Sequence, residues 1–293
     1  MEVKKKEMNA GGTVYKPSSP YEASILETKC LTGEGSADDI RHIVIDLKGS
    51  GILYKEGQSI GIQVPGTDEN GKKNRVRLYS IASPRSGEGN SADTLALTVK
   101  RVVYTDEESG KEVKGLASNY ICDLKANEKV NITGPVGRTF VLPEDENTDL
   151  IMVAVGTGIA PFRAFLHYAY EDRKTWKGKV LLFFGSKTGL ESLYMNDVNN
   201  DISQYYEVQT FTAFQALSRE GNKEYVQDHI YNNREQIWDI IEKGNFSFYV
   251  CGLKGVEEGI NKVLEEMASS KGKNWEEMVK QFKEEHRWHI ETY

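Results

Sequence analysis

The segment Gly156-Thr157-Gly158 has the residues best suited to hold a phosphate group. It follows a continuous apolar run, residues 150–155, and precedes a stretch with a helical pattern, residues 162–170. Glycines let the backbone approach a ligand, and the helix N-terminus that follows favours a pyrophosphate. Pro161 suits the first turn of that helix but occupies the third glycine position of a G-x-G-x-x-G fingerprint. An ordinary strand-to-helix turn therefore remains an alternative interpretation.

Three further segments have side chains that could bind or position a cofactor. In Arg77-Leu78-Tyr79-Ser80, the arginine and serine can bind phosphate and a ring edge, and the tyrosine can cover a flat ring; an ordinary strand is the alternative. Cys251 ends an apolar run and precedes Gly252-Leu253-Lys254-Gly255, so it stands where ligands bind in parallel sheets. A buried, inert cysteine is the alternative there. Finally, Glu291 stands two positions before the terminal Tyr293.

The elements that must position these residues fall into two groups along the chain. Residues 1–20 have no periodicity and indicate a flexible tail. Residues 21–145 contain short alternating runs separated by turns, which predict an antiparallel β-barrel or sandwich; a barrel is the expected plan. Residues 146–293 alternate apolar runs with helical stretches, which predict a doubly wound parallel sheet. The expected strands are 42–47, 59–64, 95–99, 130–132, 150–155, 180–184 and 246–250, the helices 162–170, 190–201 and 256–270, and the long loops 66–74 and 105–114.

Composition excludes several classes of protein. The 293 residues contain 37 Lys and Arg against 44 Asp and Glu, a formal charge of −7, which argues against a nucleic-acid partner. No apolar run of about 18 residues predicts a membrane span, and the charged N-terminus predicts neither a secretory nor a transit peptide. Three dispersed cysteines fit a reducing compartment and predict no iron–sulfur cluster or zinc site, and two nearby histidines are expected to be surface residues. No metal is expected.

Taken together, the four segments closely resemble plant-type ferredoxin–NADP(H) reductases of the plastidic class. The resemblance extends from about Tyr15 to Tyr293. Besides those four segments, it is carried by Glu56-Gly57-Gln58-Ser59-Ile60-Gly61-Ile62, Val99-Lys100-Arg101, Ser118-Asn119-Tyr120, Cys122-Asp123-Leu124 and Thr133-Gly134-Pro135-Val136-Gly137.

The resemblance implies an FAD site in the barrel. Arg77 would hold the pyrophosphate, because a guanidinium binds phosphate oxygens in pairs. Tyr79 would pack on one face of the isoalloxazine, Ser80 would hydrogen-bond near flavin N5, and Tyr104 would stack on the adenine. The other implied FAD contacts are Leu78, Thr98, Val99, Lys100, Leu116, Ala117, Ser118, Thr157 and Tyr293, with Thr98 and Ala117 standing where plant relatives often have cysteine.

The resemblance implies an NADP(H) site in the second domain. Ser218, Arg219, Lys223 and Tyr225 match the family's 2′-phosphate pocket, and two cations with two hydroxyls can satisfy a dianion. An NAD site would instead favour an acidic residue; solvated surface charges are the alternative. The other implied NADP contacts are Lys100, Thr157, Ser186, Lys187, Gln227, Gly252, Leu253 and Glu291, and Ser186-Lys187 replaces the Val-Pro of many plant relatives.

Four residues carry the expected catalytic roles. Ser80, Cys251 and Glu291 would line the nicotinamide pocket and position the ring for hydride transfer. Tyr293 would stack on the flavin face where the nicotinamide binds, and would therefore have to move.

The implied partner is a separate [2Fe–2S] ferredoxin, with flavodoxin as an occasional substitute. Both are acidic, so a chain of net charge −7 needs a local basic patch. The candidates are Lys72, Lys73, Arg75, Lys100 and Arg101, together with Lys283, which Glu284 and Glu285 follow.

Two other functions stay open, a reductase that delivers NADPH electrons to an oxygenase or another carrier, and a non-catalytic nucleotide-binding protein on the same fold. The chain ends at Tyr293 without a fused cluster or FMN domain, which favours a free-standing reductase. A soluble monomer is expected, cytoplasmic if bacterial and stromal if it is a mature plastid chain.

Overall fold

The computed structural model describes residues 12–293, which form two compact units. The first contains the described residues up to Cys30 together with Ile40–Arg138. The second contains Leu31–Asp39 together with Thr139–Tyr293. The tail expected over residues 1–20 lies partly outside the described residues.

The first unit is built on six antiparallel strands in the spatial order β4-β3-β8-β1-β2-β5. Ile81, directly after β4, bridges Leu97 in β5, so the two outer strands meet and the sheet closes. This closure confirms the expected antiparallel barrel, because a closed sheet leaves no long free edge. The strands are β1 (Tyr21–Cys30), β2 (Ile40–Asp46), β3 (Ser59–Gln63), β4 (Arg77–Ser80), β5 (Thr94–Lys100) and β8 (Lys129–Val136).

Aliphatic side chains from alternate strand positions fill the barrel. Ile43, Ile60, Leu97 and Ile132 are fully buried there. The helix α1 (Leu116–Asp123) adds Ile121 to the same core. Burial of each such side chain stabilises the fold by about 1.5–3 kcal/mol.

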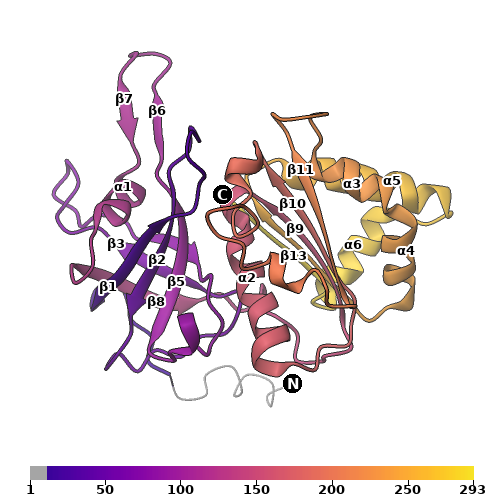
Figure 1. Ribbon diagram of the computed structural model, residues 1–293, viewed down its shortest axis with the longest axis horizontal. Coiled ribbons are helices and arrows are strands. Elements are labelled where there is room, and N and C mark those ends of the chain that lie inside the picture. Colours follow the sequence, from indigo (N-terminus) through magenta and orange to yellow (C-terminus); the bar gives the residue numbers. More distant parts are fainter. Residues whose placement is uncertain (1–11) are drawn as a thin grey trace. The chain divides into compact units, whose positions relative to one another are not determined.

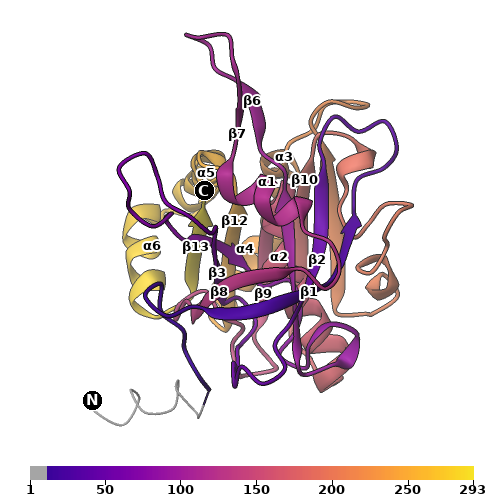
Figure 2. The same cartoon turned by 90° about the vertical axis from the view of Figure 1, so that its left-hand side faces the viewer.

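A hairpin, β6 (Val103–Thr105) with β7 (Glu112–Lys114), projects from the first unit in both views (Figure 1, Figure 2). The expectation of an irregular loop over residues 105–114 is therefore wrong at both ends, since Thr105 pairs with Glu112. The Asp106 carboxylate accepts the Ser109 amide at 2.7 Å and the Ser109 hydroxyl at 2.6 Å. Such local side-chain bonds favour a tight turn, which allows the short strands to pair.

The second unit contains a five-stranded parallel sheet in the order β11-β10-β9-β12-β13. From β9 the chain moves outward through β10 to β11, and it then returns to the other side of β9 with β12 and β13. The strand order therefore reverses between β9 and β12, and ligands bind at the carboxyl ends of strands at such a reversal. The strands are β9 (Asp149–Val155), β10 (Val180–Ser186), β11 (Phe211–Leu217), β12 (Phe246–Gly252) and β13 (Trp288–Thr292).

Helices cover both faces of this sheet, which confirms the expected doubly wound domain (Figure 1). On one face Phe162 and Phe165 of α2 pack with Phe140 and Tyr249, with ring centroids 5.1–6.4 Å apart. On the other face, side chains of the four later helices join a core that includes Trp238. The helices are α2 (Ala160–His167, continuing as a π-helical turn over Tyr168–Arg173), α3 (Val226–Asn232), α4 (Arg234–Lys243), α5 (Val256–Ser270) and α6 (Trp275–Glu284).

The helix expected over residues 190–201 is wrong. Only a 3₁₀ turn, Gly189–Glu191, forms there. The Asn196 side-chain oxygen accepts the amides of Val198 and Asn199 at 3.0 Å, and the Asn199 oxygen accepts the amide of Asp201 at 3.1 Å. These local bonds compete with a helix for the backbone donors, so the chain turns instead.

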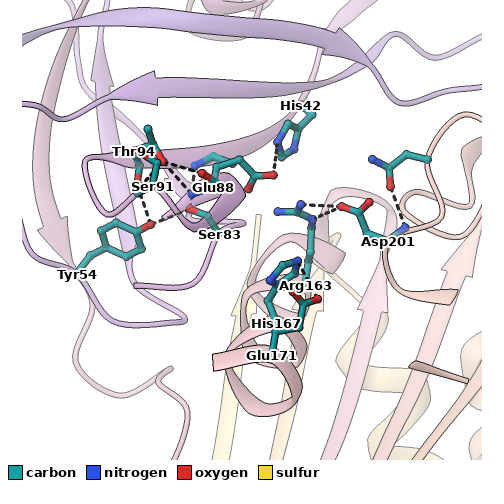
Figure 3. A network of polar contacts seen from close by, with 12 residues as sticks. His42, Tyr54, Ser83, Glu88, Ser91, Thr94, Arg163, His167, Glu171 and Asp201 are labelled. Carbon is teal, nitrogen blue, oxygen red and sulfur yellow. Dashed lines mark hydrogen bonds and ion pairs between the residues drawn. The ribbon is translucent and has the colours of Figure 1, made fainter. Parts of the chain in front are cut away.

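Buried polar contacts fix this turn-rich segment against α2. The buried Arg163 donates to Asp201 at 2.6 Å (Figure 3). It also lies 4.9 Å from the centroid of the Tyr194 ring. Among residues 12–293, no helix has both the length and the apolar character that crossing a membrane requires.

Candidate functional site

The strand reversal of the second unit brings Gly156-Thr157-Gly158 next to the end of β12. A Cβ atom on Gly158 would lie 2.0 Å from the carbonyl oxygen of Cys251, so only glycine permits this approach. Gly252 has φ +153, and a Cβ atom added there would lie 2.9 Å from the Val155 carbonyl oxygen. The strand reversal therefore brings the two candidate segments together.

The terminal Tyr293 is anchored at this point. Its amide donates to the Gly252 carbonyl at 3.1 Å, and its own carbonyl accepts the Lys254 amide at 3.3 Å. Its hydroxyl lies 2.5 Å from the Thr157 hydroxyl. The aromatic residue is nevertheless 55% exposed. The chain end is thus tied to the sheet and presents an aromatic side chain at the reversal point.

Cys251 and Glu291 lie opposite each other in neighbouring strands. Cys251 is buried, and burial followed by the nearby Glu291 carboxylate raises the pKa of its thiol, so it stays protonated at neutral pH. Burial raises the pKa of Glu291 to about 7. A protonated thiol is a poor nucleophile, so Cys251 suits a role in positioning a ligand rather than in covalent catalysis.

The proposed 2′-phosphate segment follows β11. Main-chain hydrogen bonds fix the start of this segment. The Ser218 amide donates to the Ser186 carbonyl at 3.0 Å, and the Arg219 amide donates to the Lys187 carbonyl at 2.8 Å. Arg219 and Lys223 are exposed, and Tyr225 is 53% exposed at the start of α3. The cations of Arg219 and Lys223 and the accessible ring of Tyr225 are therefore suited to bind a phosphorylated adenosine.

Four other expected NADP residues have different surroundings. Ser186 is buried, with its hydroxyl 3.1 Å from that of Ser192. The Lys187 ammonium is paired with Asp38 at 2.6 Å. Gln227 lies on α3 and is half-buried, whereas Leu253 beside the reversal point is 57% exposed.

In the first unit, β4 positions the expected flavin residues. Tyr79 and Ser80 pair with Ile60 and Ser59 of β3. Tyr79 packs against the barrel core, and burial raises the pKa of its hydroxyl to about 12. Arg77, two residues earlier on the same face of the strand, is exposed.

A polar brace that sequence reasoning missed fixes the exit of β4. The Tyr54 hydroxyl contacts Ser83 at 2.8 Å and donates to the Pro84 carbonyl at 2.6 Å (Figure 3). The Ser83 hydroxyl accepts the Ala96 amide at 2.9 Å. Lone Tyr and Ser residues far apart in sequence give no signal of such a brace.

The N-terminus of α1 is suited to bind an anion. No side chain caps it and its first turn contains no acidic residue, so it can receive an anion. Ser118 is engaged locally, since its hydroxyl accepts the Val102 amide at 3.2 Å. Ala117 is buried with it.

Several apolar side chains of the first unit are exposed where a flat cofactor could cover them. They are Leu78, Val102, Val103, Tyr104 and Leu116, each 41–59% exposed. Thr98 and Val99 are buried in β5, opposite His42 and Arg41, and Lys100 ends that strand half-buried. Exposed apolar side chains with a cation and an uncapped helix start are the residue types that a dinucleotide cofactor uses.

The expected basic residues differ in how accessible they are. Lys72, Lys73 and Arg75 are exposed, and the Asp68 carboxylate shapes their loop by accepting the Lys72 amide at 2.9 Å. Arg101 is instead paired with Asp123 at 2.7 Å. Lys283 is exposed in the last turn of α6.

The fold and the two sites define a two-domain flavin- and pyridine-nucleotide-dependent oxidoreductase. Family models agree, since the oxidoreductase FAD-binding domain matches residues 33–140 and the oxidoreductase NAD-binding domain matches residues 152–262.

Curated relatives make the assignment more specific. The chain is 42% identical to a ferredoxin–NADP reductase of Spirulina sp., covering 96% of this chain and 97% of the relative. It is also 42% identical to the cyanelle ferredoxin–NADP reductase of Cyanophora paradoxa, covering 96% and 78%. The chain therefore belongs to the ferredoxin–NADP reductase family.

Solved structures show the same fold. A ferredoxin–NADP+ reductase from Plasmodium falciparum superposes with a TM-score of 0.75 at 26% identity, covering 97% of this chain and 100% of that one. A point mutant of that enzyme in complex with 2′P-AMP superposes with a TM-score of 0.73 at 26% identity, covering 95% and 98%.

Proposed function

We propose that this chain transfers electrons between NADP(H) and a ferredoxin. FAD and NADP(H) are its cofactors, as its family and both domain matches indicate. Bound FAD supplies the ability to exchange a hydride with the nicotinamide and to pass electrons one at a time. The proposed FAD-binding domain is residues 21–145, and the proposed NADP(H)-binding domain is residues 146–293.

For FAD, the proposed contacts begin with Arg77 at the pyrophosphate, Tyr79 against the isoalloxazine, Ser80 near N5 and Tyr104 at the adenine. The exposed Arg77 and the uncapped start of α1 support the pyrophosphate assignment. The remaining contacts come from Leu78, Thr98, Val99, Lys100, Leu116, Ala117, Ser118, Thr157 and Tyr293.

For NADP(H), Arg219 and Lys223 are the proposed ligands of the 2′-phosphate, with Ser218 and Tyr225 beside them. Their exposure after β11 supports this choice. A relative of the same fold was solved in complex with 2′P-AMP, an adenosine nucleotide that has the distinguishing phosphate. Lys100, Thr157, Ser186, Lys187, Gln227, Gly252, Leu253 and Glu291 complete the proposed set.

The terminal Tyr293 is the observation that carries the proposal of hydride transfer. It is held at the strand reversal by Gly252, Lys254 and Thr157, with Cys251 and Glu291 in the adjoining strands. A module that only binds a nucleotide has no use for an aromatic side chain where the nicotinamide must enter. We propose that Tyr293 covers the flavin until the nicotinamide displaces it, and that Ser80, Cys251 and Glu291 position the ring.

The proposed protein partner is a ferredoxin, with flavodoxin as a substitute. The relatives are named for ferredoxin, and the exposed Lys72, Lys73 and Arg75 offer a local positive surface. Lys100, Arg101 and Lys283 are the further proposed docking residues. We propose a monomer, located in the cytoplasm of a bacterium or in a plastid stroma.

The purified protein tests the proposal directly. It should be yellow, release FAD on denaturation and reduce ferricyanide with NADPH in preference to NADH. A colourless protein that binds NADPH without oxidising it would support the non-catalytic alternative. Efficient transfer to an oxygenase component but not to ferredoxin would support the other alternative.

A further inference from the structure

The segment proposed to bind the 2′-phosphate, residues 218–225, contains acidic residues as well as the two proposed phosphate ligands. The acids are Glu220 and Glu224. The Glu224 amide donates to the Leu217 carbonyl at 3.1 Å, so the segment closes into a loop and Glu224 is part of it. A carboxylate in this loop opposes the binding of a phosphate dianion, because like charges repel.

Both carboxylates accept a hydrogen bond that fixes their direction. Glu220 accepts the Gly189 amide at 2.7 Å. The Glu224 Oε2 lies 3.0 Å from the Nε2 of His229, which stands on α3 directly after the loop. A carboxylate can only accept, so the ring nitrogen is the donor. Glu224 is therefore the acid of this loop that is held by a side chain able to change its own charge.

The strands under α3 bring no other charge to the His229 ring. On the side of β11 the ring meets the Phe214 ring, with centroids 6.2 Å apart. Neither β10 nor β11 contains an ionisable residue. The charge of His229 is therefore not compensated from the sheet.

The neighbouring helices are directed elsewhere. Gln227 meets α5, since a Cβ atom on Gly259 would lie 3.4 Å from it. Two positions on a helix are about 200° apart, so α5 lies against a different side of α3 from His229. In α4, the Arg234 guanidinium lies over the Tyr231 ring, 4.2 Å from its centroid.

The remaining acid of α3 is also engaged elsewhere. The Asp228 carboxylate accepts the Tyr225 amide at 2.8 Å. Within residues 12–293, Glu224 is thus the acid with which the His229 side chain pairs.

We propose that His229 is a positioning residue that ties Glu224 to α3 and, when protonated, cancels the charge of that carboxylate in the loop that receives the 2′-phosphate. The inference rests on the proposed NADP(H) site. Histidine changes its charge between about pH 5 and pH 8. The pair has a net negative charge when the ring is neutral and none when it is protonated, so affinity for the phosphorylated nucleotide should rise as the ring gains its proton.

Inhibition by 2′P-AMP against NADPH, with ferricyanide as acceptor, isolates this end of the nucleotide. H229Q keeps an amide that can donate to Glu224 but cannot titrate. Its inhibition constant should match that of the starting protein within about twofold at about pH 8, and should be about threefold higher at about pH 6 and low salt. The 2′-phosphate itself titrates in this range, so the two proteins are compared at the same pH. The kcat at saturating NADPH should not differ.

E224Q tests the other half of the pair at a more exposed side chain. It removes the carboxylate and should lower the inhibition constant of 2′P-AMP about threefold at about pH 8. NADH lacks the 2′-phosphate, so its KM should show neither difference. Parallel pH profiles for H229Q and the starting protein would overturn the role of His229. An unchanged inhibition constant in E224Q would overturn the opposition between carboxylate and phosphate.

Two further variants complete the design. H167Q removes another histidine beside a glutamate, Glu171 at 3.4 Å in the same unit, and should follow the pH profile of the starting protein. R219A tests the proposed site itself and should weaken inhibition by 2′P-AMP tenfold or more. FAD content and the thermal unfolding midpoint, measured for each variant, verify that the fold is intact.

The result for R219A separates the two levels of the argument. If R219A acts as expected while H229Q and E224Q do not, the inference about His229 fails and the proposed function stands. If R219A leaves the inhibition constant unchanged, the proposed phosphate pocket is wrong and the inference fails with it.

Discussion

At the residue scale, the candidate site of the second unit depends on close contacts between glycine backbones and their neighbours, and on the side chain of the terminal Tyr293. Tyr293 is joined to Gly252 and Lys254 through its main chain and to Thr157 through its hydroxyl. Displacing the ring breaks the bond to Thr157, at a cost of order 1 kcal/mol. A nicotinamide that takes its place must offset that cost. We therefore expect this residue to set how tightly the nicotinamide end of NADP(H) is held.

Replacement of Tyr293 tests this role. Y293S should bind NADP+ more tightly and turn over more slowly, because the nicotinamide no longer competes with the ring and is released less readily. Difference absorbance titration gives the dissociation constant, and steady-state NADPH oxidation gives kcat. Y206S removes another tyrosine of similar exposure and should change neither. An unchanged NADP+ affinity in Y293S would sink the proposed competition.

Glu291 should make stability depend on pH. Its pKa in the folded protein is about 7, raised from 4.5 by burial. Between these two pH values, the folded state therefore holds a proton that the unfolded state has lost. Stability due to this group is therefore fully present below pH 4.5 and is lost as pH rises through 7. The unfolding free energy relative to E291Q should fall by up to about 3 kcal/mol.

Denaturant unfolding of both proteins at several pH values measures this difference. E291Q is the control for the starting protein, because glutamine keeps the size of the side chain and cannot titrate. Parallel pH profiles for the two proteins would show that Glu291 is not the group responsible.

At the scale of elements, the sequence predicted the central strands well and the irregular connections poorly. The apolar runs that became β9, β10 and β12 are buried on both faces, so their composition alone identifies them. The edge strands β11 and β13 escaped prediction. β11 has buried, half-buried and exposed positions in no regular alternation, and β13 forms the chain end, where fraying is the usual expectation.

The residues of the candidate site were likewise predictable where they belong to a local motif, and not where distant residues meet. Motif segments such as Gly156-Thr157-Gly158 and Gly252 were found because each is read from neighbouring residues. The pairing of Asp38 with Lys187 joins positions 149 residues apart, and no local pattern shows it. The Thr188–Glu191 capping box directly after Lys187, in contrast, has a readable sequence signal.

We expect nucleotide binding to depend on the junction between β9 and α2. G158A would place a methyl group 2.0 Å from the Cys251 carbonyl oxygen, so β12 and α2 must separate. We expect a loss of about 1–3 kcal/mol in unfolding free energy, the cost of overpacking, and weaker NADP+ binding. Calorimetry and titration measure the two effects.

A methyl group added elsewhere is the matched control for that variant. Gly272 lies in an exposed turn, and a Cβ atom added there by G272A would meet no other atom within 4 Å, although the φ of +68 causes a modest strain. It should leave NADP+ affinity unchanged. Equal affinity in G158A and the starting protein would contradict the role given to the close approach.

At the scale of the whole molecule, the net charge of −7 hides local differences in sign. The loop after β3 has three exposed cations, Lys72, Lys73 and Arg75. An acidic carrier is repelled by the molecule as a whole and attracted at such a patch, so docking should be local and salt-dependent.

K72Q/K73Q should therefore raise KM for ferredoxin severalfold at low salt and reduce its dependence on salt, with ferricyanide reduction unaffected. The double variant K48Q/K125Q makes the same change in net charge at two other exposed lysines of the first unit and should have a smaller effect. If both double variants weaken ferredoxin turnover equally, net charge rather than the loop determines docking.

The central claim is that bound FAD passes electrons between NADP(H) and ferredoxin in this chain. Stopped-flow absorbance with the protein, NADPH and its native ferredoxin tests it most directly. The account predicts rapid bleaching of the flavin by NADPH, followed by reduction of ferredoxin at a rate that keeps pace with turnover, and the reverse sequence with NADP+ and reduced ferredoxin. Flavin reduction by NADPH with no transfer to ferredoxin in either direction would contradict it.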